Sequence, residues 1–277
     1  MWCSGWRLAA AVSNAGGLGL LGAGSMHPET LREHIRKCRE ATHHAFGVNI
    51  PLMYPQIEEI MQIVADEGVK IVFTSAGSPK KWTGWLHERG ITVVHVVSSS
   101  RFAVKAEEAG VDAIVAEGFE AGGHNGREET TTLCLIPAVR AVTTLPLIAA
   151  GGIATGEAML AARVLGAEGV QIGTRFALTA ESSANEVFKD YCLHLEEGDT
   201  RLLLKKLAPV RLVRNNFRSA VEAAEAVGAS EEELRILLGR GRAKRGIFEG
   251  DLEEGELEIG QVSALLHGKG AVSYTHL

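Results

Sequence analysis

The chain has 277 residues, of which 46% are hydrophobic and 22% charged, an ordinary balance for a globular protein with a full core. Its formal net charge of -6 argues against a general affinity for nucleic acids or anionic membranes, because both favour basic surfaces. The four cysteines form no CxxC pair and no Cys/His ligand spacing, so we expect free thiols and neither a disulfide framework nor a zinc site.

The N-terminal part begins with a predicted helix from Trp6 to Asn14, and residues 8–24 resemble the middle of a signal peptide. Several glycines and the pair Ser13-Asn14 leave this stretch short of the roughly 18 uninterrupted apolar residues of a membrane span, so we expect folded core. Residues 17–22 satisfy the GxGxxG pattern, but they follow a helix and largely form a strand themselves. A dinucleotide-binding site is therefore rejected here.

Seven short apolar runs follow one another along the first 180 positions. They are rich in valine and isoleucine and do not alternate with polar residues, which is typical of parallel strands buried on both faces. Amphipathic stretches separate them, several ending at a glycine that can cap a helix. The predicted strands are residues 18–21, 46–50, 69–74, 91–97, 111–116, 147–150 and 169–172.

Alternating strands and helices indicate an α/β protein with a parallel sheet. One more strand before Met1 would complete eight βα units, so we predict a (β/α)8 TIM barrel that is N-terminally truncated, its first strand missing. An open doubly wound sheet is the alternative. We expect the barrel over residues 1–182, a helical lid or substrate subdomain over residues 183–250, and a returning barrel helix with a frayed tail over residues 251–277.

Glycine loops follow the last two predicted strands. Gly151 and Gly152 precede a predicted helix, and Gly173 and Thr174 follow the next strand. Paired glycines let backbone N–H groups approach an anion closely, and a helix start adds a positive dipole end. Either glycine loop alone could be an ordinary turn. Two such loops after the last two strands occupy the position where barrel enzymes usually bind phosphate. We therefore predict phosphate binding, with Arg175 either pairing with the phosphate or bracing the rim.

The loop after residues 111–116 contains the sequence Gly122-Gly123-His124. A long glycine-rich loop is unusual unless its backbone approaches a ligand, and an imidazole titrates near neutrality, which suits proton transfer. We predict that His124 is catalytic, a purely structural histidine being the alternative. The carboxylates of Glu117 and Glu120 in the same loop would either orient a ligand or face solvent.

Together these motifs resemble one family, the FMN-dependent barrel enzymes that include nitronate monooxygenases (2-nitropropane dioxygenases) and flavin-type enoyl-ACP reductases II. The resemblance implies a bound FMN and acid/base chemistry by His124. The similar segments are residues 9–19, 47–50, 116–124, 149–153 and 171–176. The cofactor-binding residues that it implies are Gly151, Gly152, Gly173 and Thr174 at the phosphate and Asn49, Thr74, Glu117, Gly122, Gly123 and Gln171 at the ring.

The resemblance implies an FMN-dependent oxidoreductase, and we expect a nitronate monooxygenase that oxidises alkyl nitronates with O2. The alternative is an enoyl-ACP reductase II of fatty-acid synthesis with NAD(P)H as electron donor, which residues 117–121 and 259–261 favour. A flavin-free phosphate-binding barrel enzyme and an inactive fragment are further alternatives. We expect a cytoplasmic protein acting on a small-molecule substrate, with no nucleic-acid or membrane partner. The sequence does not decide between a monomer and a homodimer.

Overall fold

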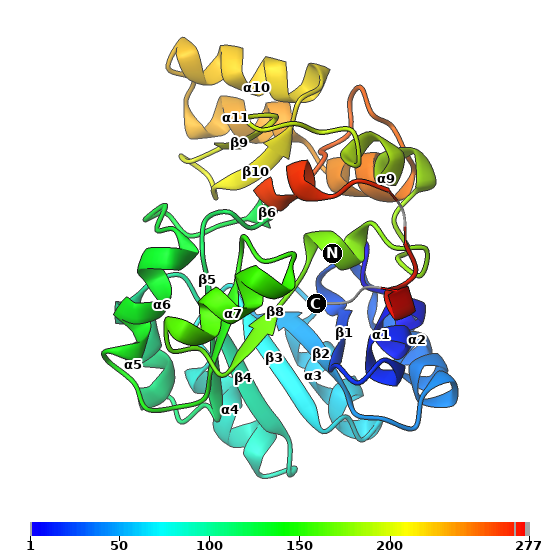
Figure 1. Cartoon of the computed structure of the whole chain (residues 1–277), viewed down its shortest axis with the longest axis vertical. Coiled ribbons are helices and arrows are strands. Elements are labelled where there is room, and N and C mark those ends of the chain that lie inside the picture. The colour runs from blue at the N-terminus through cyan, green and yellow to red at the C-terminus, as the bar shows by residue number, and fades with distance from the viewer. Residues whose placement is uncertain (1, 269, 275–277) are drawn as a thin grey trace.

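A curled sheet of seven parallel strands, wrapped by helices, forms the larger part of the protein (Figure 1). The structure is a computed structural model that describes residues 2–268 and 270–274. In sheet order the strands are β1 (Gly19–Gly22), β2 (Phe46–Pro51), β3 (Ile71–Ser75), β4 (Thr92–Val97), β5 (Ala113–Glu117), β7 (Leu147–Ala150) and β8 (Gly169–Gln171). Each overlaps its predicted range, and the TIM-barrel-like α/β fold is confirmed.

The sheet does not close into a complete barrel in the part of the chain that the structure describes. Strands β1 and β8 stand at the two ends of the strand order, and each pairs with one neighbour, β2 and β7 respectively. All six pairings are parallel, as the buried, non-alternating sequence of the strands predicts. The carboxyl ends of the strands therefore lie at the same edge of the sheet.

Helices pack on the outer face of the curl, and local signals start and end them. Pro28 is the first residue of α2, the side chain of Thr155 caps α7, and Gly110 follows α5 with a φ of +82°. These helices are α1 (Trp6–Asn14), α2 (Pro28–Ala41), α3 (Ile57–Asp66), α4 (Lys80–His87), α5 (Ser100–Glu108), α6 (Thr132–Arg140) and α7 (Gly156–Val164). The short α8 (Thr174–Ala177) follows β8 and packs against the C-terminal 3-10 helix Gln261–Leu265 instead.

The two faces of the curled sheet carry different apolar clusters. Side chains such as Val72 and Ile114 pack against the helices in the main core. Phe73, Val94 and Val115 belong to a second cluster inside the curl. Successive side chains of a strand point to opposite faces of the sheet. A residue next to one in the main core therefore points inside the curl, and a residue next to one inside the curl points toward the helices.

A smaller lobe follows the barrel and stands above it in Figure 1. Its antiparallel sheet has the order β6-β10-β9, and its helices are α9 (Glu186–Cys192), α10 (Asn216–Ala226) and α11 (Glu231–Leu238). The strands are β6 (Gly123–His124), β9 (Thr200–Leu203) and β10 (Val210–Val213). The segment expected as a helical lid, residues 183–250, thus also contains two strands, β9 and β10. They pair with each other, and β10 pairs in addition with β6 from the distant loop after β5.

The C-terminal part also differs from its prediction. The returning helix expected near residues 256–266 is only a 3-10 helix, Gln261–Leu265. Before it the chain runs extended beside β10: Glu258 bridges to Leu212, and the Val213 N–H donates to the Leu257 carbonyl. Of the predicted frayed tail, residues 272–274 form a further 3-10 turn, and residues 275–277 lie outside the described part of the chain.

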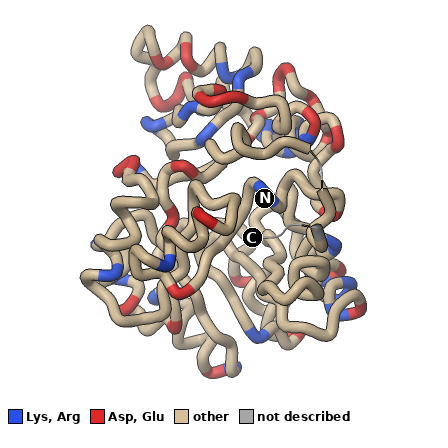
Figure 2. The backbone as a smooth tube through the Cα atoms, in the orientation of Figure 1, with Lys and Arg blue, Asp and Glu red and all other residues tan. Residues whose placement is uncertain are grey.

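Charged residues of both signs are interspersed over the helices of both lobes in the view of Figure 2. This mixture agrees with the small net charge of -6 and gives that view no single-sign face. Over residues 2–268 and 270–274, no helix combines the length and apolarity needed to cross a membrane.

Candidate functional site

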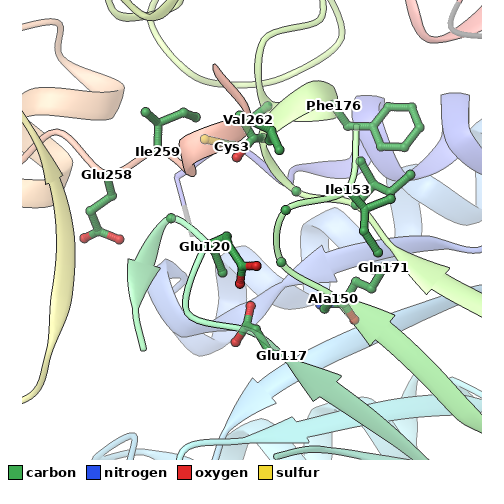
Figure 3. A pocket seen from close by; sticks show the side chains of 18 of the residues that line it. Cys3, Glu117, Glu120, Ala150, Ile153, Gln171, Phe176, Glu258, Ile259 and Val262 are labelled. Carbon is green, nitrogen blue, oxygen red and sulfur yellow. The ribbon is translucent and has the colours of Figure 1, made fainter. Parts of the chain in front are cut away.

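A cavity of about 240 Å³ lies where the carboxyl ends of β5, β7 and β8 meet the smaller lobe. Loops at this end of a parallel barrel are where active groups gather, because every strand delivers its following loop there. Figure 3 shows Glu117, Glu120 and Gln171 of the barrel loops on one side of this space and Cys3 and Val262 on the other. Of the predicted site residues, those that line the cavity are Glu117, Gly122, Gly151, Gly152, Gln171, Gly173 and Thr174.

The loop after β7 has a backbone that only glycine adopts readily. Gly151 and Gly152 have φ angles of +88° and +71°, and a Cβ on Gly151 would lie 2.5 Å from the Gly118 carbonyl oxygen. Consecutive residues of this kind present backbone N–H groups to one side, which suits an anion. Since α7 begins at Gly156, its dipole adds a positive end nearby.

The loop after β8 offers the cavity a second set of polar groups. The Thr174 hydroxyl accepts a hydrogen bond of 3.0 Å from the Gly260 N–H, which leaves its own proton to donate to a ligand. A Cβ added to Gly173 would meet no atom within 4 Å, so this glycine faces open space. The Gln171 Oε1 is buried and has no hydrogen-bond partner among the described residues. A buried acceptor without a partner indicates a place where a ligand donor belongs.

Two carboxyls of the loop after β5 face the cavity but have different surroundings. Glu117 ends β5, and burial raises its pKa to about 7. The Glu120 carboxylate accepts hydrogen bonds from the Thr132 N–H at 3.0 Å and from the Thr132 hydroxyl at 3.1 Å. Figure 3 shows the two side chains directed toward each other. One carboxyl is thus tied to the start of α6, while the other can hold a proton near neutral pH.

Asn49 and Thr74 do not line the cavity in the structure. Thr74 is fully buried, and its Oγ1 lies 2.7 Å from Nδ1 of His95, whose pKa burial lowers to about 4. Because the preceding Phe73 points inside the curl, the Thr74 side chain points to the helix-facing side. Asn49 lies between Val48 and Ile50 of the outer core, so its side chain points inward from β2.

His124 and Gly123 form the two-residue strand β6 beside the cavity and do not line it. The His124 side chain is exposed, and its backbone pairs with Val210 of β10. Gly123 has a φ of +73°, and a Cβ there would lie 2.4 Å from Oε2 of Glu258. The catalytic role of His124 therefore stays a prediction, since its exposed side chain is not part of the cavity wall, although Gly122, two residues earlier, is.

Sequence reasoning missed the C-terminal strap, residues 256–262, which closes the cavity from above. Its Gln261 N–H donates to the Glu120 carbonyl at 3.0 Å, and its Gly260 N–H reaches Thr174 on the other loop. Glu258, Ile259 and Val262 line the cavity, as does Cys3 from the N-terminal segment. Ile259 belongs to the segment 259–261 that the resemblance singled out, but nothing in the sequence placed it or the other three residues at the cavity, because each reaches it through contacts with distant loops.

Comparison with known proteins finds one family. Its profile, described as nitronate monooxygenase, matches residues 1–62 and 56–273. A probable nitronate monooxygenase of Staphylococcus aureus is 33% identical over 238 residues, which cover 70% of this chain and 67% of that protein. Among solved structures, FabK from Thermotoga maritima is similar with 40% identity and a TM-score of 0.91, covering 98% of this chain and 86% of that one. A nitroalkane oxidase from Streptomyces ansochromogenes gives 26% identity and a TM-score of 0.84, with coverage of 98% and 90%.

Proposed function

Because the chain belongs to the nitronate monooxygenase family, we propose that it binds FMN in the cavity and oxidises alkyl nitronates with O2. The observation that carries this proposal is the glycine cradle at Gly151 and Gly152, together with the unpartnered Oε1 of Gln171 in the same cavity. The cradle suits a phosphate, and the buried amide suits a ring with polar edges, so the residues present fit FMN.

The phosphate would be held by backbone groups. No lysine, arginine or histidine is among the cavity-lining residues of the described chain, whereas Glu117, Glu120 and Glu258 are. The N–H groups of Gly151, Gly152 and Gly173, the Thr174 hydroxyl and the dipole of α7 would therefore supply the favourable electrostatics. Glu120 lies close to this cradle, since a Cβ on Gly152 would be 3.5 Å from its Oε1. The phosphate would therefore lie toward Gly173 and Thr174.

The ring would lie between the loop after β5 and Gln171. Gly122 has no side chain there, and a Cβ on it would lie 2.5 Å from the Ile259 carbonyl carbon, so the wall at this point is bare backbone. Gln171 would orient the ring through its free Oε1. FMN supplies the electron transfer when bound, while the protein binds, orients and moves protons.

Two residues are proposed to handle the substrate proton. Glu117 is in the wall and can be protonated or ionised near neutral pH. His124 lies two residues after Gly122 in the same loop, so its exposed imidazole must turn toward the cavity to reach a substrate. Hydrogen bonds of catalytic groups often tighten only when substrate binds. The position of His124 without substrate is therefore compatible with a role in proton transfer.

A second candidate is reduction of an enoyl thioester with NAD(P)H through the same FMN. It is favoured by the 40% identity to FabK from Thermotoga maritima over 98% of this chain. Both candidates share the FMN site and differ in the electron donor and the final acceptor. The family match alone does not separate them, because both chemistries use the flavin ring at the same place.

Oxygen uptake with propionate 3-nitronate, measured without NADH, tests the proposal. The purified protein is first incubated with FMN and scanned for flavin absorbance after removal of free FMN. We expect retained flavin and nitronate-dependent oxygen consumption. Turnover only with NADH and a crotonyl thioester would establish the reductase alternative instead. Absence of flavin absorbance would contradict both and leave a phosphate-binding barrel without flavin.

A further inference from the structure

Arg211 is a buried arginine of β10 that reaches across to the loop after β5. It is 2% exposed. Its Nε and Nη2 donate to the Phe119 carbonyl at 3.1 and 2.6 Å, and Nε also donates to the Ala121 carbonyl at 3.2 Å. Its Nη1 donates to the Thr200 hydroxyl at 3.3 Å, and the guanidinium carbon lies 5.0 Å from the centre of the Phe119 ring. Most of its donors therefore serve one loop.

The Arg211 guanidinium is held by carbonyl groups and not by a carboxylate. Within the described residues it takes part in no ion pair, although Glu120 and Glu129 act on it at longer range. A buried guanidinium is costly unless its N–H groups are satisfied, and here backbone carbonyls of the loop satisfy them. Hydrogen bonds from a charged donor are stronger than those between neutral groups, so the loop is held firmly at these two carbonyls.

The same strand also holds the end of the loop through its backbone. Arg211 stands opposite Gly123 and Val210 stands opposite His124 in the β6–β10 pairing, and the Asn125 N–H donates to the Pro209 carbonyl at 2.8 Å. The side chain of Arg211 therefore fixes the carbonyls that precede Glu120 and Gly122, while its backbone strand fixes the residues that follow. Glu120 and Gly122, between these anchors, line the cavity.

From these contacts we infer that Arg211 is a positioning residue, which holds residues 118–124 in the conformation that forms the cavity wall and presents His124. Its consequence for catalysis rests on the proposed flavin function. A planar fork with several N–H groups is needed, because two carbonyls and a hydroxyl lie in different directions. Lysine keeps the positive charge but offers a single nitrogen, so it cannot make the same set of bonds.

Comparison of Arg211→Lys with Arg218→Lys tests the inference. Arg218 is a matched control: it is 6% exposed in the same lobe and donates to Glu222 at 2.9 Å and to the Asp199 carbonyl at 2.5 Å, away from the loop. Hydrogen–deuterium exchange of a peptide covering residues 118–126 is measured first, on flavin-free protein. We expect exchange at least about tenfold faster in R211K and unchanged in R218K, as loss of a charged hydrogen bond implies.

Flavin titration and kinetics follow on the same variants. In R211K we expect the FMN dissociation constant to rise about tenfold and kcat for the nitronate to fall by a similar factor, with a smaller change in KM, because a displaced wall disturbs positioning more than binding. R218K should keep both values even where its melting temperature falls. A general loss of stability would move both variants alike.

Equal loop exchange in the two variants, whether both fast or both slow, would overturn the inference. If R211K does not fold, Phe119→Leu removes only the ring beneath the guanidinium. That variant must then speed exchange of residues 118–126 at an unchanged melting temperature, and unaltered exchange would count against Arg211. A wild-type chain that binds no FMN would refute the proposed function alone, since the exchange comparison is made without flavin.

Discussion

Glu117 and Glu120 show how position within one loop decides what a carboxyl can do. Glu120 accepts hydrogen bonds from both the N–H and the hydroxyl of Thr132, which hold its side chain in place. Burial raises the pKa of Glu117 to about 7, because it favours the neutral form of the carboxyl. The same chemical group is therefore a fixed anchor at one position and a titrating group at the other.

Replacing Glu117 by glutamine should stabilise the protein at alkaline pH. The ordinary pKa of this carboxyl is 4.5, and the fold raises it to about 7. The folded state thus binds the proton more tightly, so this group favours folding fully below pH 4.5 and loses that contribution as the pH rises through about 7. We expect E117Q to raise the melting temperature at pH 8 by about 2–4 °C and to match the wild type at pH 4.5, as calorimetry would measure.

Glu120→Gln is the control for that experiment and should act in the opposite direction. Its amide keeps one acceptor oxygen but turns an NH2 group toward the Thr132 N–H. We expect a loss of about 1 kcal/mol in the free energy of unfolding at pH 8. A gain in stability in both variants would mean that charge repulsion in the cavity, and not the burial of Glu117, sets the pH dependence.

His124→Ala should separate catalysis from stability. The side chain is exposed, and β6 pairs through its backbone, so the free energy of unfolding should change by no more than about 0.5 kcal/mol. If the imidazole moves the substrate proton, kcat should fall by about 10²–10⁴ while FMN stays bound. An unchanged turnover rate would give His124 a structural role and leave Glu117 as the proton-handling group.

Among the elements, the loops after β7 and β8 contain glycines for two different physical reasons. Gly151 needs its glycine because of its φ of +88° and the close Gly118 carbonyl. Gly173 has no positive φ, and its Cβ position is open. The first glycine is thus required by the fold, whereas the second matters only for what enters the cavity.

Alanine at the two positions should therefore give different results. We expect Gly151→Ala to destabilise the protein by about 1–3 kcal/mol and to abolish FMN binding, because the loop must leave its left-handed conformation. Gly173→Ala should keep the wild-type melting temperature and still weaken FMN binding, since the added methyl group occupies cavity space. Unchanged FMN affinity in G173A would contradict a phosphate at this loop. Denaturant unfolding and flavin titration supply the two measurements.

On the scale of the whole molecule, the cavity is built by three distant parts of the chain. Ser4 belongs to the N-terminal segment, Gly151 to the barrel, and Ile259 to the C-terminal strap. The smaller lobe has its own apolar cluster, including Val210 and Phe217. All three parts line the cavity, so we expect a ligand bound there to stabilise the molecule as a unit.

Adding FMN should raise the melting temperature of the flavin-free protein. At a concentration 100 times the dissociation constant, binding contributes about 2.7 kcal/mol, which corresponds to roughly 5–10 °C for a chain of this size. Riboflavin, which has the same ring and no phosphate, is the matched control and should give a much smaller shift. Equal shifts for the two ligands would place the binding energy in the ring and contradict the phosphate cradle.

Much of the fold follows from local patterns. The apolar runs predict all seven parallel strands, and glycines such as Gly110 mark helix ends, because burial on two faces and a left-handed cap leave a signature within a few residues. The glycine loops after β7 and β8 were also predicted to lie together, since parallel strands deliver their loops to one edge. Both loops line the cavity.

The local patterns do not reveal which face each side chain points to, or which distant segments pair; both follow from the folded structure. A shift of one residue along a strand reverses the face of a side chain, so Thr74 turns toward the helices while its neighbour Phe73 points inside. Arg211 lies 92 positions from Phe119, and no motif near either residue predicts their contact. Local patterns were enough to predict the strands, the helices between them and the glycine cradle, because these depend on near neighbours. Which side chains face the cavity depended on how distant strands pair, which only the folded chain fixes.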